Sequence, residues 1–313
     1  MIMKKTPLRL AQLASIVLLL FLILFPVWFN LFPEYFNVFI SEIFFFIAFA
    51  MALNLITGFT GYLPFGLYFF TGVGSYVYVL SIVKFNLGTF LGFVICMLIG
   101  LFFAYLLGLA MARVKGSYFA IGSFALAESM KYFFVNWGFV GKGMGLSLPP
   151  IFNLERFYWL SLLMCLITSL TFYFIRRNIR LRIMLTAIKV SESTAKICGI
   201  NVSWPKILVT LFAGTYASIL GAIWAQYQTY IAPTTVFSEM FVVVALAGCL
   251  LGGMGTLGGP ILGTVFFLIL RELCWFVFPD FFLLILGLSI MFTIKYIPNG
   301  IYPYLKKRIA SDD

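Results

Sequence analysis

The feature that most constrains this chain is a series of long runs without a charged residue. Residues 43–83 carry no charge over 41 positions, about twice the 20 residues that an apolar helix needs to cross the hydrocarbon core of a bilayer. Only 10% of the 313 residues are charged and 63% are hydrophobic, whereas soluble domains carry about 25% charged residues. A water-soluble protein is therefore excluded, and the sequence predicts an all-α polytopic membrane protein.

Counting the apolar runs against this length predicts about ten transmembrane helices. Two runs are too long for one helix, and glycine and proline residues divide each of them into two spans. The predicted spans are Leu10 to Pro33, two within residues 43–83, Phe85 to Ala112, Tyr118 to Trp137, Phe157 to Ile175, Ile207 to Gln228, Phe237 to Leu251, Leu257 to Phe278 and Asp280 to Lys295. No hydrophilic domain separates them, so residues 1–313 are expected to form a single transmembrane domain.

The basic residues indicate how the chain lies in the bilayer. With the N-terminus inside, 16 of the 21 Lys and Arg residues fall in cytoplasmic segments. Because cytoplasmic loops are enriched in Lys and Arg, both termini are expected in the cytoplasm and the loop with Lys142 outside. This asymmetry also accounts for the net charge of +11, so no nucleic-acid partner is expected. The first apolar run is longer than that of a cleavable signal peptide, which predicts an uncleaved span.

The side chains needed for most chemistry are missing. The chain has no histidine, and aspartate occurs only at Asp280, Asp312 and Asp313. The five cysteines show no short paired spacing, so neither a metal site nor a disulfide framework is indicated. We expect no catalytic residue, no metal and no cofactor. A Gly-x-x-x-x-Gly-Lys-[Ser/Thr] phosphate loop is also absent from the sequence, so any ATP-driven step needs a partner protein.

The longest polar stretch between spans, about residues 176–206, is the first candidate functional feature. Within it Ala187, Ser191, Ala195 and Gly199 recur every four residues, which on a helix gives one narrow stripe of small side chains. Glu192 can pair with lysines on a neighbouring face. Such a helix is suited to lying in a groove of another protein. The alternative is a solvated connecting helix whose charges only fix the topology.

Two glycine-rich breaks are the second feature. In transporters, broken helices in corresponding parts of the two halves mark the translocation path, and helix breaks at membrane depth must face protein or a water-filled cavity. The alternative is close helix packing, which glycine also allows. We favour the path, with the candidate residues Thr57, Gly58, Thr60, Gly61, Gly66, Gly252, Gly253 and Gly255.

Glu128, with Lys131 one turn away, is the most deeply placed acid. An ionisable residue within a span is by default a functional hypothesis. The alternative, which we favour, is that the two residues form an ion pair and neutralise each other toward the outer interface. Glu42, Glu239 and Glu272 lie near span ends and are weaker candidates. The sequence lacks the series of mid-depth acids that a proton-coupled carrier would use.

Four motifs give the chain a specific resemblance, from about Leu53 to Gly300, to the permeases of branched-chain amino acid ABC importers. It resembles the type called the M subunit of the leucine–isoleucine–valine system. The motifs are Leu53-Asn54-Leu55-Ile56-Thr57-Gly58-Phe59-Thr60-Gly61, Arg113-Val114-Lys115-Gly116-Ser117-Tyr118-Phe119-Ala120-Ile121 leading to Glu128, Ala187-Ile188 through Glu192 and Ala195 to Gly199-Ile200-Asn201, and Leu251 to Pro260 followed by Pro298-Asn299-Gly300. Each motif alone is weak, but their order and spacing are specific.

The resemblance implies a set of partners. These are a second, similar permease, two cytoplasmic ATPase subunits and an extracytoplasmic binding protein, assembled in a bacterial inner membrane. It also implies that residues 176–206 form the coupling region, in which Ala187, Ser191, Glu192, Ala195 and Gly199 contact the ATPase. We therefore expect a permease subunit that moves branched-chain or other hydrophobic amino acids by alternating access.

The chain departs from the family pattern after the first break. Where the family commonly has polar Ser and His positions, this chain has Pro64 and Leu67. The path thus offers few groups that hold a zwitterion, and specificity is expected to rest mainly with the binding protein. Permeases of the same superfamily carry urea, sugars or nucleosides, which remain alternatives, as does a stand-alone secondary transporter.

Overall fold

A computed structural model describes residues 34–114, 116–149, 153–277 and 300–304, with the isolated positions 284, 287, 288, 291 and 295. The long helices are α2 (Glu34–Thr60), α3 (Tyr68–Val83), α4 (Thr89–Arg113), α5 (Ser117–Asn136), α6 (Leu154–Arg177), α9 (Ser203–Gln228), α11 (Met240–Gly252) and α12 (Gly258–Val277). Shorter helices are η1 (Phe65–Leu67), η2 (Gly138–Val140), η3 (Lys142–Met144), α7 (Ile179–Val190), α8 (Glu192–Ile197) and α10 (Pro233–Val236). Two short strands, β1 (Leu146–Ser147) and β2 (Tyr230–Ile231), complete the described part.

Seven helical segments in the described residues are long and apolar enough to span a membrane, which confirms the all-α polytopic class. They correspond to the predicted spans two to four and six to nine, with the eighth running from Pro233 to Gly252. The fifth predicted span is the 20-residue helix α5, which carries Glu128 and Lys131 and is not among these seven segments, so its place as a span remains a prediction. The first predicted span and most of the tenth lie outside the described residues, so the count of ten remains a prediction.

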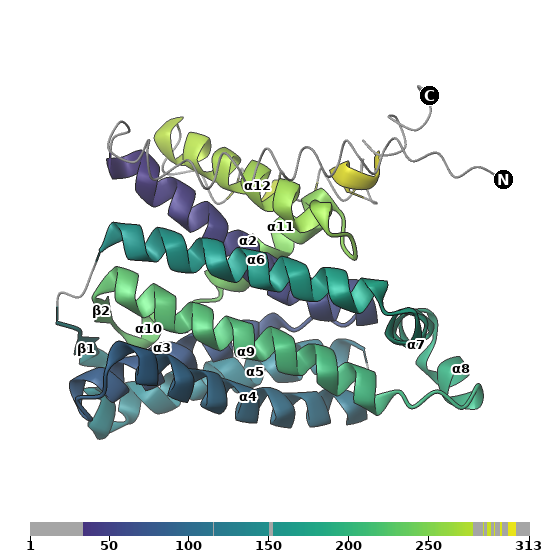
Figure 1. The fold of residues 1–313 in the computed structure, drawn as a ribbon, viewed down its shortest axis with the longest axis horizontal. Helices are drawn as coiled ribbons and strands as arrows, with labels where there is room; N and C mark the ends of the chain where they lie inside the picture. The colour runs from purple at the N-terminus through teal and green to yellow at the C-terminus, as the bar shows by residue number, and fades with distance from the viewer. Residues whose placement is uncertain are drawn as a thin grey trace.

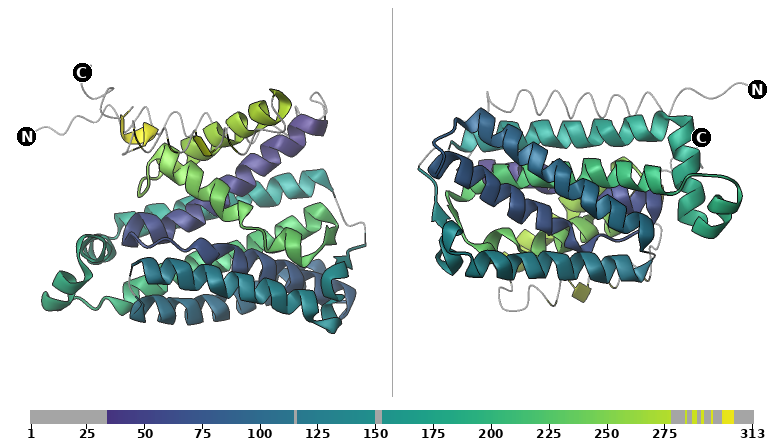
Figure 2. Two further views of the ribbon diagram at one scale, coloured as in Figure 1. Left: turned by 180° about the vertical axis from the view of Figure 1, so that it is seen from behind. Right: turned by 90° about the horizontal axis from the view of Figure 1, so that it is seen from below.

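Most long helices lie side by side and give the molecule two distinct ends (Figure 1, Figure 2). At one end, on the right in Figure 1, lie α7 and α8. At the other end β1 and β2 pair antiparallel, with Leu146 opposite Ile231, and tie the loop before α6 to the loop after α9. We call these the α7–α8 end and the β end.

Helix α9 lies in the middle of the bundle and contacts α2, α3, α4 and α6. Small residues let it approach α3 closely, because a side chain at Gly221 would collide with the carbonyl oxygen of Thr71. Because the two helices are this close, Ser75 Oγ donates a hydrogen bond to the carbonyl oxygen of Gly221 at 2.7 Å. Such small-residue crossings are typical of helices packed within a membrane.

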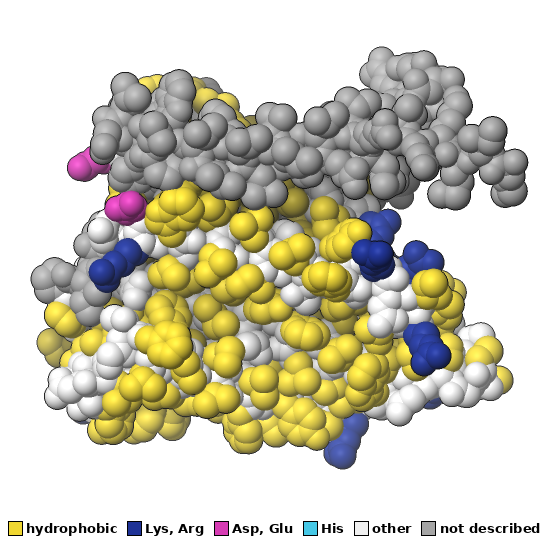
Figure 3. All heavy atoms as spheres, viewed as in Figure 1, with side chains coloured by type: hydrophobic (Ala, Val, Ile, Leu, Met, Phe, Trp, Pro, Cys, Tyr) yellow, Lys and Arg dark blue, Asp and Glu magenta, His cyan; other side chains and the backbone are white. Residues whose placement is uncertain are grey.

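The surface supports a membrane location. Hydrophobic side chains cover the middle of the face seen in Figure 3, whereas Lys and Arg gather mainly at the α7–α8 end. Exposed aromatic and aliphatic residues on α4 and α5, such as Phe90, Phe102 and Tyr132, belong to this apolar surface. A soluble monomer rarely exposes so large an apolar area.

Candidate functional site

The first glycine-rich break forms where α2 ends. Gly61 has a φ of +75°, a left-handed conformation that glycine adopts without steric cost and that commonly ends a helix. Its amide donates to the carbonyl oxygen of Thr57 at 3.0 Å. The hydroxyls of Thr57 and Thr60 bond back to their own helix, to the carbonyl oxygens of Leu53 and Ile56. These threonines therefore do not present free hydroxyl donors to a path.

The second break joins α11 to α12. Gly253 and Gly255 have φ values of +111° and +80°, and Gly252 packs so tightly that a side chain there would collide with the carbonyl of Gly259. Gly66, beside the first break, is likewise packed against the backbone of Ser123. Thus Gly66 and Gly252 serve close packing, the alternative considered from the sequence.

The two breaks touch each other. A Cβ at Gly58 would lie 2.8 Å from the Cα of Gly255, a distance at which something must move. Asn54, one turn earlier in α2, bridges the contact: its Oδ1 accepts from the amide of Gly255 at 2.8 Å, and its Nδ2 donates to the carbonyl of Thr256 at 3.0 Å. We call residues 54–61 with residues 253–256 the glycine junction.

The polar segment of residues 176–206 reaches this junction directly. Lys189, at the end of α7, donates from Nζ to the carbonyl oxygen of Gly58 at 3.0 Å. The side chain of Lys189 also lies close to Gly61 and Gly255. Both glycine-rich breaks therefore lie at the α7–α8 end.

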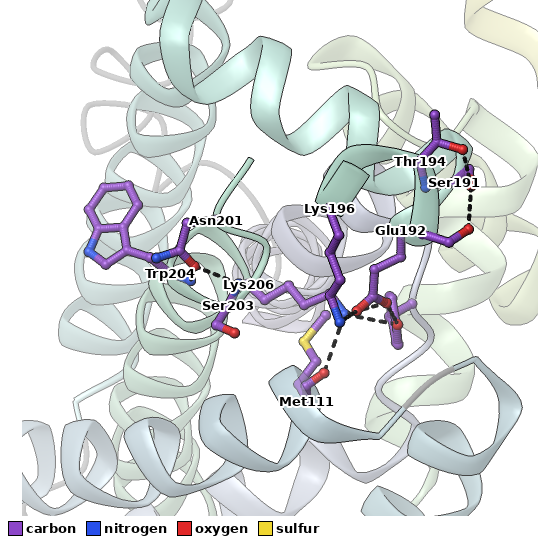
Figure 4. A network of polar contacts seen from close by, with 11 residues as sticks. Met111, Ser191, Glu192, Thr194, Lys196, Asn201, Ser203, Trp204 and Lys206 are labelled. Atoms are coloured by element: carbon purple, nitrogen blue, oxygen red, sulfur yellow. Dashed lines mark hydrogen bonds and ion pairs between the residues drawn. The ribbon is translucent and has the colours of Figure 1, made fainter. Parts of the chain in front are cut away.

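A second connection is a buried ion pair (Figure 4). Lys206 Nζ lies 2.8 Å from Glu192 Oε2 and 2.9 Å from the hydroxyl of Tyr62, and the lysine side chain is fully buried. Tyr62 in turn donates to Glu192 at 2.6 Å. Lys196 lies 3.5 Å from the other carboxylate oxygen of Glu192. The network joins α8, the start of α9 and the linker after α2.

The electrostatics of this network keep Glu192 ionised. Burial alone would raise the pKa of the Glu192 carboxyl, but hydrogen bonds from Lys206 and Tyr62 and the charges of Lys206 and Lys196 lower it below its ordinary value. Burial and the bond to Glu192 raise the pKa of Tyr62 to about 12. At neutral pH the site therefore holds a carboxylate at Glu192 and a neutral phenol at Tyr62.

The predicted stripe of small residues is not on one helix. Ser191 leaves helical geometry, with φ −161° and ψ 114°, and its side chain caps α8 by accepting from the amide of Thr194. Ala195 is only 2% exposed and packs with Ile188 and Val202. Instead of a flat stripe, α7 and α8 form a groove of about 560 Å³ lined by Ala187, Val190, Ser191, Ala195 and Cys198 among others. Gly199 follows α8 with a φ of +76°.

An open cavity of about 760 Å³ lies between the first break, the beginning of α5 and residues 188–192. Of the predicted path residues, Thr60 and Gly61 line this cavity.

The predicted ion pair lies further along α5. Lys131 Nζ is 2.7 Å from Glu128 Oε2, so the structure brings the predicted pair together. The described residues contain no group of three His, Cys, Asp or Glu side chains placed to hold a metal ion.

The family comparison decides the class of this protein. The family described as "Branched-chain amino acid transport system / permease component" matches residues 35–294. The chain belongs to this family. Its membership confirms the predicted resemblance and the predicted class of a membrane permease.

Two relatives of this permease carry the name "High-affinity branched-chain amino acid transport system permease protein LivM", one from Salmonella typhimurium and one from Escherichia coli. Each is 24% identical over 296 residues, which cover 84% of this chain and 69% of the relative. No solved structure matches the chain.

Several permease residues that hold the site together were not singled out from the sequence. Asn54, Tyr62 and Lys206 make contacts over 130 to 202 positions of the chain, which no local pattern reveals. A weak signal was present: a buried asparagine in an apolar run and a lysine at the start of a span need partners.

Proposed function

We propose that this permease moves branched-chain or other hydrophobic amino acids across a bacterial inner membrane by alternating access. The observation that carries the mechanism is the contact between the coupling segment, residues 176–206, and the glycine junction. Lys189 bonds to the backbone of Gly58, and Glu192 is held by Tyr62 and Lys206. A displacement of α7 and α8 is thereby transmitted to α2, α9 and, through Asn54, to the α11–α12 turn.

The energy source in this proposal is a pair of cytoplasmic ATP-binding subunits that dock on the α7–α8 end. The groove between α7 and α8 supports this, since Val190 and Ile197 beside it are 82% and 86% exposed. Exposed apolar side chains at the polar end of a membrane protein favour a protein partner. A second permease and an extracytoplasmic binding protein complete the proposed importer. The small residues Ala187, Ser191 and Ala195 line the docking groove, and Gly199 follows α8 beside it.

The orientation in this proposal places the α7–α8 end in the cytoplasm and the Lys142 loop outside, with both termini cytoplasmic. Cys198 is the one exposed cysteine in the described residues, so the native chain carries its own probe. In cells that express this chain without the proposed ATPase, a membrane-impermeant maleimide should label Cys198 in inside-out vesicles and not in intact spheroplasts, with Cys198→Ser as the control. Labelling from the outer face only would reverse the orientation.

The function itself is tested by uptake. Deleting the gene in its native cells should abolish high-affinity uptake of leucine, isoleucine and valine, and a plasmid copy should restore it. Liposomes with the purified chain alone should not transport these amino acids, because the chain lacks the phosphate loop. Transport by the lone chain without ATP would show a stand-alone secondary transporter instead.

A further inference from the structure

A second polar cluster lies away from the glycine junction, between α3 and α5. Lys131 Nζ contacts both oxygens of Glu128, at 2.8 Å and 2.7 Å. The hydroxyl of Tyr68 donates to Glu128 Oε1 at 2.7 Å. Both charged side chains remain accessible, Glu128 to 23% and Lys131 to 18%, in contrast to the sealed Lys206.

The cluster lies about midway along a predicted span. Glu128 follows the first residue of α5, Ser117, by 11 positions, or about 16 Å at 1.5 Å per residue. Charges at this depth are costly and usually mark a substrate or ion pathway. The internal pair reduces the cost, because Glu128 and Lys131 together carry no net charge.

The open cavity leads toward this cluster. Its lining follows one face of α5 from Ser117 through Ala120 to Phe124. Phe124 is one helical turn before Glu128, and its ring meets that of Tyr68 edge to face with centroids 6.2 Å apart. Phe124, which lines the cavity, is therefore connected through Tyr68 to the ion pair.

A further helix interruption, which was not predicted from the sequence, packs against α3. Between α10 and α11 the chain leaves helical geometry at Phe237, whose φ and ψ are −95° and 45°. Phe237 packs beside the middle of α3, with its ring 6.3 Å from that of Tyr76. Non-helical backbone at membrane depth is tolerated where it is buried in protein or lines a water-filled cavity.

We propose that Glu128 and Lys131 form a binding site for the two charged ends of a zwitterionic amino acid in the translocation path. The substrate ammonium replaces Lys131 at Glu128, and the substrate carboxylate binds Lys131, so the net charge of the site stays at zero. Tyr68 holds Glu128 in place during this exchange, and the apolar cavity wall at Phe124 accommodates an aliphatic side chain. This inference rests on the proposed amino acid transport and assigns its polar contacts.

The test uses the transporter purified from its native cells through a tag on this chain. Photo-leucine, a leucine analogue with a diazirine on its side chain, is cross-linked and the labelled peptides are identified by mass spectrometry. We expect labelling near Phe65, Tyr68 and Phe124 that excess leucine suppresses. Glu128→Gln and Lys131→Met should each lower the labelling at least about tenfold, since each change leaves one charged end of the substrate without its partner at a partly buried site.

The control variant is Glu42→Gln. Glu42 pairs with Arg271 at 3.1 Å and the pair is similarly accessible, but it joins α2 to α12, and no residue within one helical turn of either lines the cavity, whereas Phe124 before Glu128 does. Loss of the Glu42 carboxylate in this variant should leave the photo-leucine labelling unchanged. If Glu42→Gln lowers the labelling as much as Glu128→Gln does, the effect belongs to stability and the proposed site is wrong.

Competition by two analogues separates recognition from a structural ion pair. Leucinamide lacks the carboxylate and 4-methylpentanoate lacks the ammonium, so both should compete at least about tenfold less well than leucine with the native transporter. Lys131→Met should reduce the difference in competition between leucine and leucinamide, but not that between leucine and 4-methylpentanoate. Glu128→Gln should reduce only the difference between leucine and 4-methylpentanoate. Equal analogue preferences in all three proteins would overturn the site.

Gene deletion in the same cells distinguishes this inference from the proposed function. Lost leucine uptake on deletion, combined with native labelling in both variants, overturns the binding site alone. Unchanged uptake of leucine, isoleucine and valine on deletion overturns the proposed substrate and this site with it.

Discussion

Lys189 donates a hydrogen bond from Nζ to the carbonyl oxygen of Gly58, 3.0 Å away and 131 positions earlier in the chain. The bond ties the end of α7 to the last turn of α2, beside the contact between Gly58 and Gly255. A lysine at the end of a polar helix thus meets a backbone carbonyl at the end of a membrane helix. The bond directly connects the segment with the proposed ATPase surface to a membrane helix.

The contact between the two breaks leaves no room for a methyl group at Gly58. A Cβ there would lie 2.6 Å from Asn54 Oδ1 and 2.8 Å from the Cα of Gly255. We expect Gly58→Ala to separate the breaks, to cost about 1–3 kcal/mol as overpacking does, and to reduce uptake strongly. Gly122→Ala is the matched control, since Gly122 is also helical and meets nothing within 4 Å. The melting temperature and the leucine uptake of both variants are measured. If Gly58→Ala and Gly122→Ala have the same melting temperature and uptake, the glycine junction is not tightly packed.

The two partners of the buried ion pair should differ in their effect on stability. Glu192→Gln leaves the fully buried ammonium of Lys206 without its carboxylate, which costs about 3–5 kcal/mol in buried pairs. Lys206→Met should cost less, because Glu192 stays partly exposed and keeps Lys196 at 3.5 Å. Thermal unfolding of the purified variants gives the order, and the double variant should lose less than the two single losses combined. A larger loss for Lys206→Met would contradict this account of the network.

The docking surface is best tested at exposed positions. Val190→Asp and Ile197→Asp should each weaken recovery of the proposed ATPase at least about tenfold, because a charge replaces an apolar contact, while melting temperature stays unchanged. Ala195→Trp should instead lower the melting temperature, since Ala195 is buried against Ile188 and Val202. Met144→Asp, at an exposed position of the β end, is the control. Normal ATPase recovery with both Val190→Asp and Ile197→Asp would exclude the groove as the docking site.

Hydrophobic length predicted most of the fold, because a bilayer sets the length of every spanning helix. The predicted span Phe85 to Ala112 is the helix Thr89–Arg113, and residues 43–83 divide at Gly61 as expected. The interruption between α10 and α11 was missed because residues 237–239 contain neither glycine nor proline. Packing of Phe237 against α3 and α5 accompanies that interruption, and such tertiary contacts leave no local signature.

The site was predicted only in its parts. The glycine motifs, Glu192 and the Glu128–Lys131 pair were named from the sequence, but the contact between the two glycine motifs and the bond from Lys189 to Gly58 were not. The prediction of one stripe of small residues was wrong because it assumed that a single helix continues through Ser191. A serine followed by an acidic residue is a helix N-cap signal, and Ser191 indeed caps α8, which begins at Glu192. Asn54 and Lys206 act through partners far along the chain, which a single sequence does not reveal.

The most direct test of the central claim is the ratio of ATP hydrolysed to amino acid transported by the complete importer in liposomes. The account predicts that Lys189→Met still binds the ATPase and hydrolyses ATP but transports poorly, so the ratio rises at least about tenfold, as expected when a coupling contact worth over about 1.4 kcal/mol is lost. Lys196→Met, on the same segment but half exposed and paired only at 3.5 Å, should keep the native ratio. A native ratio and native uptake with Lys189→Met would contradict the claim that the coupling segment drives the glycine junction.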